Sequence, residues 1–229
     1  MIAGPDSTVR TMRRALGRSI GALAAAHAAD LDRSADDRAF FLAERAKLEP
    51  LAAQIRDAHL ALDDFDLGPG EIQQAQVAIG DEVLDRGVRA GNTRAKLGLK
   101  GKPGLGAAHV FGERIDDLTA TPVAKEPAAV LSAAERLDDV AAFDGRDAIK
   151  ADLTLRATQQ DGFLKLRDQG DAERTKIQSQ ATRLVVEAAL ALASLKGALD
   201  QRFPRQRKYV ASFFLDVGAK RTKKDEEEA

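Results

Sequence analysis

Apolar residues recur every three or four positions along most of the chain, which is the spacing of one face of an α-helix. The longest stripe runs through Ile177, Ala181, Leu184, Ala188, Leu192, Leu195, Leu199 and Phe203. Shorter stripes cover residues 9–31, with Ser7 as the expected N-cap, and residues 36–65, where Pro50 interrupts the pattern. This periodicity predicts an all-α chain of long amphipathic helices.

The segment 67–71 (Leu-Gly-Pro-Gly-Glu) predicts a break between two helices. A further helix, expected to end near Leu97, is indicated by apolar residues at Ile72, Ile79, Val83 and Leu84. A connection this short predicts that the flanking helices lie antiparallel. We therefore expect an N-terminal helical hairpin over residues 7–97.

Glycine is concentrated in the middle of the chain, with seven glycines between residues 86 and 112. Each glycine disfavours a helix interior by about 1 kcal/mol relative to alanine, so a long glycine- and lysine-rich loop is expected over 98–127. Helical spacing resumes over 128–219, with possible breaks at 144–145, 161–162 and 169–170. A short aromatic helix is expected after Pro204, and a charged tail over 220–229. The simplest architecture is one domain, 1–229, folded as an elongated up-down bundle of about four long helices.

Composition narrows the classes of function. The chain has no cysteine, which excludes disulfides and thiolate chemistry, and only 4% of its residues are aromatic. No apolar run approaches the roughly 20 residues that span a bilayer, so an integral membrane protein is not expected. We expect a cytoplasmic protein. The alternative is export through a twin-arginine-like N-terminus at Arg13-Arg14, although the helical stripe there favours an ordinary helix.

The usual catalytic and cofactor motifs are missing. His27, His59 and His109 are isolated, and none is preceded by the glutamate that a Glu-x-x-His metal pair requires. Segment 64–68 begins like a calcium loop, but Gly68 and Pro69 break that pattern. Segment 98–106 resembles a phosphate-binding loop, yet Pro103 follows Lys102 where Ser or Thr is needed. We therefore expect no enzyme, no catalytic residue, no metal or cofactor and no small-molecule substrate.

Charges are sorted into zones although the net charge is only −1. Residues 57–85 carry eight acids and no base, residues 86–112 carry six bases and no acid, and residues 202–224 are again basic. We expect the interaction side chains to be the acids Asp63, Asp64, Asp66, Asp81, Glu82 and Asp85 and the bases Arg86, Arg89, Arg94, Lys96, Lys100 and Lys102.

Two functional hypotheses follow from this sorting. The first is a non-enzymatic structural protein that associates with other proteins, mainly with copies of itself, by matching acidic with basic zones. The second is a binder of an anionic polymer or surface, such as nucleic acid or acidic lipid, through the glycine-lysine loop and the C-terminal bases. The acidic and basic zones could also pair with each other within one molecule. In that case neither zone would be available to contact a partner.

Overall fold

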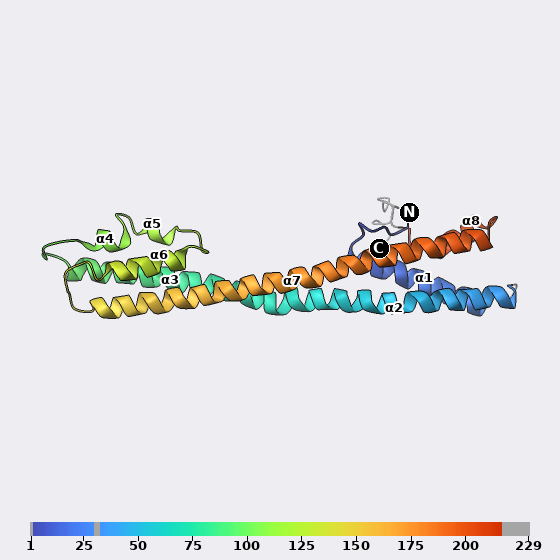
Figure 1. Cartoon of the computed structure of the whole chain (residues 1–229), viewed down its shortest axis with the longest axis horizontal. Coiled ribbons are helices and arrows are strands. Elements are labelled where there is room, and N and C mark those ends of the chain that lie inside the picture. The colour runs from blue at the N-terminus through green and yellow to red at the C-terminus, as the bar shows by residue number, and fades with distance from the viewer. Residues whose placement is uncertain (1, 30–32, 217–229) are drawn as a thin grey trace, which may run out of the picture. The chain divides into compact units, whose positions relative to one another are not determined.

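The computed structural model describes residues 2–29 and 33–216, and every regular element in these ranges is a helix (Figure 1). The all-α prediction is confirmed. The elements are α1 (Val9–Ala29), α2 (Ala35–Phe65), the π-helix η1 (Asp66–Gly70), α3 (Glu71–Gly98), α4 (Ala107–Phe111), α5 (Asp116–Thr119), α6 (Glu126–Arg136), α7 (Arg146–Arg202) and α8 (Arg207–Ser212).

The chain divides into two compact units, one formed by residues 1–64 and 174–229 and the other by residues 65–173. Each unit has its own apolar core, and α7 supplies residues to both cores. Between these contributions, residues 171–180 of α7 include no buried side chain. The single-domain organisation over 1–229 remains a prediction.

The first unit packs α1, α2, the C-terminal part of α7 and α8 around one core (Figure 1). Its buried residues include Met12, Leu16 and Leu23 of α1 together with Leu192 and Leu199 of α7, so the predicted helical stripes do form the packed faces. Thr8 rather than Ser7 caps α1, because its Oγ1 accepts a hydrogen bond from the Thr11 amide at 3.1 Å. Leu31, at the end of the first expected stripe, and Val217, expected in the short aromatic helix after Pro204, lie outside the described residues.

The second unit packs α3, α4, α6 and the N-terminal part of α7 around Leu84, Val88, Phe111, Leu137 and Leu153. Small residues on one face of α3 allow α7 to approach closely. A Cβ built on Gly80 would lie 2.0 Å from Gln160 Oε1, and one built on Gly87 would lie 2.5 Å from Arg156 Cδ. These glycines therefore serve packing between helices rather than chain reversal.

Three expected breaks are absent. The backbone stays helical from α2 through η1 into α3, so no turn forms at Gly68-Pro69. Likewise, α7 runs without interruption through Gly162 and Gly170 and begins after the turn at Gly145. The expected loop over 98–127 contains the short helices α4 and α5 and the start of α6.

Candidate interaction surfaces

The acids of the second unit are not all available to a partner. Asp81 and Asp85 of α3 lie against Glu126 at the start of α6, and the Glu126 side chain is only 1% exposed. Burial, then hydrogen bonding to Asp81 and Asp85 and their negative charge, raises the pKa of Glu126 to about 9. Glu126 is therefore protonated at neutral pH and can share its proton with the two aspartates. Asp81 and Asp85 thus lie against Glu126, and their expected role as contact residues stays a prediction.

The boundary between the acidic and basic zones is partly neutralised within α3 itself. Arg89 lies 3.3 Å from Asp85, and Arg86 lies 3.5 Å from Glu82, both at the i,i+4 spacing of one helix face. The Arg86, Arg89 and Glu82 side chains are nevertheless more than half exposed. Such exposed ion pairs stabilise the fold by only about 0–1 kcal/mol each, so these charged side chains can pair with another molecule instead.

The remaining bases of this zone lie at the C-terminal end of α3 and just beyond it. Arg94, Lys96 and Lys100 are exposed, and none forms an ion pair with an acid of the described chain. Positive charges at this end of a helix interact favourably with the negative end of the helix dipole. Lys102 instead donates a hydrogen bond to the Ala142 carbonyl and so anchors the glycine-rich loop.

The three expected contact acids at residues 63–66 differ in setting. Asp63 lies 3.1 Å from His59 Nδ1, one helical turn earlier on α2. Asp64 is exposed, and Asp66 is half-buried in η1. Asp63 and Asp64 belong to the first unit, whereas Asp66 and the other nine expected residues belong to the second.

The other two histidines also have local partners. His27 Nδ1 lies 3.0 Å from the Arg38 carbonyl, and His109 Nε2 lies 3.2 Å from Asp139. Within the described ranges, no three His, Asp or Glu side chains are grouped so that they could hold a metal ion.

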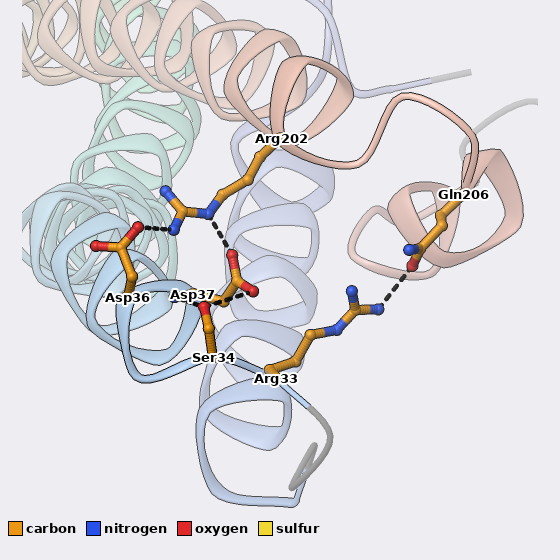
Figure 2. Close-up of polar contacts among 6 residues, drawn as sticks. All are labelled: Arg33, Ser34, Asp36, Asp37, Arg202 and Gln206. Carbon is orange, nitrogen blue, oxygen red and sulfur yellow. Dashed lines mark hydrogen bonds and ion pairs between the residues drawn. The ribbon is translucent and has the colours of Figure 1, made fainter.

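An ion-pair cluster that the sequence pattern did not indicate joins α7 to the start of α2 (Figure 2). Arg202 donates to Asp37 through Nε and to Asp36 through Nη2, each at 2.5 Å. Ser34 caps α2, since its Oγ accepts from the Asp37 amide at 3.1 Å, and this holds Asp37 in place. The hydrogen bond from Arg202 holds the pKa of Asp37 below its usual range. Arg202 therefore acts inside the first unit, although the sequence placed it among the C-terminal bases.

Aromatic rings surround this cluster. The Arg33 guanidinium carbon lies 4.7 Å from the Phe203 ring centre and 4.6 Å from that of Tyr209. Arg33 also donates a hydrogen bond to Gln206 Oε1 at 2.6 Å (Figure 2). Phe41 stacks on Phe203 with ring centres 5.8 Å apart. These contacts close one end of the apolar core, so we interpret them as structural.

Several large apolar side chains of α3 are exposed. Ile72 is 59% exposed, Ile79 is 65% exposed and Leu97 is 71% exposed. The core face of the same helix is formed by Val77, Leu84, Val88 and Ala95 instead. Isolated surface leucines are ordinary, but three exposed large residues on one helix define an apolar surface that this unit leaves uncovered.

A scan against models of known protein families, a search of curated proteins and a search of solved structures each found no match. No helix among the described residues is both long and apolar enough to cross a membrane.

Proposed function

We propose that this chain is a non-enzymatic interaction protein that acts through protein–protein association, mainly self-association, by matching acidic with basic surface zones. The expected long helices over the whole chain belong to this proposal, without the hairpin turn expected at residues 67–71, where the backbone stays helical. The observation that carries it is the group of exposed bases Arg94, Lys96 and Lys100, which have no acidic partner in the described chain. The acids Asp81 and Asp85, which lie against Glu126, are not needed for the proposed contact.

Physical reasons favour a partner for this zone. Like charges held on one helix end repel one another, and an opposite charge on another molecule relieves that repulsion. Complementary fields also speed encounter and set the register of association. Glu71 and Glu82, which are exposed on the same helix, supply the matching negative charge.

Sedimentation velocity of the whole protein over a range of concentrations, at low and at high salt, tests the proposal. We expect a mass above that of the monomer at low salt and dissociation as salt is raised, because salt screens exposed charges. The triple variant Arg94→Glu, Lys96→Glu, Lys100→Glu should weaken association at low salt. A protein that stays monomeric at every salt concentration would contradict the proposal.

The alternative function is binding of an anionic polymer or surface through the same basic region. It is favoured by a further group of exposed bases around the start of α8, namely Arg205, Arg207 and Lys208. Gel shift with single-stranded RNA and flotation with acidic vesicles test it. Lys100→Glu with Lys102→Glu should abolish binding, whereas Lys47→Glu with Lys165→Glu, which changes the net charge equally, should not. Equal binding by both variants would exclude the loop as the contact.

A further inference from the structure

The exposed apolar residues of α3 lie on one stripe of the helix. Ile79 follows Ile72 by seven residues, and Leu97 follows Ile79 by five full turns, so at about 100° per residue all three point in nearly the same direction. Ala75 and Ala90 fall close to the same line and are also exposed. The stripe extends over most of the length of α3, and Arg86, which lies within about 20° of the same direction and whose side chain is 66% exposed, interrupts it between Ile79 and Ala90.

The stripe faces away from the unit's own core. Leu84, Val88 and Ala95 are fully buried and lie roughly opposite the stripe around the helix. The glycines that approach α7, such as Gly80, lie about a quarter turn from it. None of the described helices of this unit covers the stripe, as the exposure of Ile72, Ile79 and Leu97 shows.

The charged residues beside the stripe change sign along the helix. By helical angle, Glu71, Glu82, Arg89 and Lys96 all lie on the same side of it, about 60–100° around from Ile79, and Lys100 follows in the turn just after α3. The two acids occupy the N-terminal half of α3, whereas the bases Arg89 and Lys96 occupy its C-terminal half and Lys100 lies just beyond it. This flank is therefore complementary to a reversed copy of itself.

We propose that the α3 stripe is a self-association surface, on which α3 of a second copy of this chain packs antiparallel about a two-fold axis near the middle of the helix. This inference rests on the proposed self-association and specifies its contact. The apolar residues pack against each other on either side of the axis, and Arg86 of each copy, which is ion-paired with Glu82 of its own helix, lies near the axis. Glu71 of one copy lies near Lys96 and Lys100 of the other, and Glu82 lies near Arg89 of the other.

The antiparallel direction follows from the placement of charge. In an antiparallel helix pair each flank meets the same flank of the partner, so acid meets base at both ends. In a parallel pair, the flank with Arg89 and Lys96 on one copy would instead meet the other flank of the partner helix, whose charged residue is Arg94. Arg94 would then lie among like charges. Because a two-fold contact is formed by the same residues on both copies, it closes as a dimer rather than growing into a filament.

A single substitution tests the apolar part of the surface. Ile79→Asp should weaken dimerisation at least about tenfold, which corresponds to about 1.4 kcal/mol. Leu190→Asp is the matched control, because Leu190 of α7 is 67% exposed and lies in the other unit. Circular dichroism should show equal helix content in both variants. If Ile79→Asp and Leu190→Asp dimerise equally well, the α3 stripe is not the contact.

A charge exchange tests the direction. The variant Glu71→Lys, Glu82→Lys carries only positive charge on this flank, and the variant Arg89→Glu, Lys96→Glu, Lys100→Glu carries only negative charge. Each alone should be largely monomeric at low salt, and an equimolar mixture should form a heterodimer. Two variants that dimerise alone, or a mixture that stays monomeric, would overturn the antiparallel pairing.

Cross-linking gives an independent readout of register, because the chain contains no cysteine of its own. An equimolar mixture of Glu71→Cys and Lys100→Cys proteins should be joined by a short bis-maleimide, whereas either protein alone should not. Wild-type dimers that dissociate with salt and are weakened by the triple variant Arg94→Glu, Lys96→Glu, Lys100→Glu, but that tolerate Ile79→Asp and give no cross-link in the cysteine mixture, would preserve the proposed self-association and refute this surface. A wild-type protein that never associates would refute both.

Discussion

Phe143 packs directly against the backbone of Gly98, at the last residue of α3. A Cβ placed on Gly98 would lie 2.3 Å from Phe143 Cδ2 and 3.1 Å from Phe143 Cβ. The ring cannot retreat easily, because its own Cβ is also close and the side chain is buried in the second core. Glycine is thus required here by proximity, since its backbone φ is not in the left-handed region.

We expect Gly98→Ala to lower the free energy of unfolding by about 1–3 kcal/mol, the usual cost of forcing an extra methyl group into a packed site. Gly162→Ala is the control, because a Cβ at Gly162, inside α7, would meet nothing within 4 Å. That change should raise stability by about 0.5–1 kcal/mol through helix propensity. Urea unfolding measures both, and equal effects would show that Phe143 does not constrain Gly98.

We expect the ionisation of Glu126 to lower the free energy of unfolding as pH rises. Its pKa is about 9 in the folded protein and about 4.5 in the unfolded chain, so the folded state binds the extra proton between these values. The stabilisation is fully present below pH 4.5 and is lost as pH rises through about 9. Glu126→Gln, which cannot ionise, should therefore become more stable than the wild type by at least about 1 kcal/mol at high pH. The control is Glu135→Gln, an exposed position on the same helix, and its difference from the wild type should not change with pH.

The Arg202 cluster should produce the opposite pH dependence. The hydrogen bond from Arg202 lowers the folded pKa of Asp37 below 3.8, so this stabilisation is present above that value and is lost as pH falls through the lowered pKa. Arg202→Lys keeps the charge but loses the two-pronged contact with Asp36 and Asp37. It should reduce stability at neutral pH and flatten the acid limb of the pH profile. Arg205→Lys, at an exposed position, should do neither.

Pro50 lies inside α2 rather than at its start, where it removes one backbone hydrogen bond. Pro50→Ala should therefore raise the free energy of unfolding by about 1–3 kcal/mol. Thermal unfolding followed by circular dichroism measures the change. A loss of stability on replacing Pro50 would mean that the helix ends or restarts at this residue.

Periodic spacing predicted the helices and much of the first core correctly, because helix period is a local property of the sequence. The stripe from Ala181 to Phe203 is buried or half-buried along its whole length. The breaks expected at Gly162 and Gly170 failed for a different reason. A glycine costs a helix only about 1 kcal/mol, and the packing of other α7 residues into the two cores offsets this cost.

The interaction residues were harder to predict because their settings depend on distant parts of the chain. Nothing near Asp81 or Asp85 in the sequence signals that Glu126 will lie against them. In the sequence Arg202 is one of a run of C-terminal bases, whereas in the folded chain it lies beside Asp36 and Asp37. Ser34 followed by Asp37 did carry a usable signal, since this spacing is typical of a capped helix start. The exposed stripe of α3 was present in the pattern, but spacing alone does not say which apolar face is covered.

Residues 171–180 of α7 include no buried side chain. The backbone amides of this helix should therefore be unevenly protected against hydrogen exchange with solvent. Amide protons of residues packed in either core should exchange only when that core unfolds. Those of residues 171–180 should exchange through local unfolding of the helix. One continuous backbone helix would then appear as two slowly exchanging blocks separated by a fast one. A protease that cuts after lysine should find Lys176, inside that fast block, before most other lysines of the long helix.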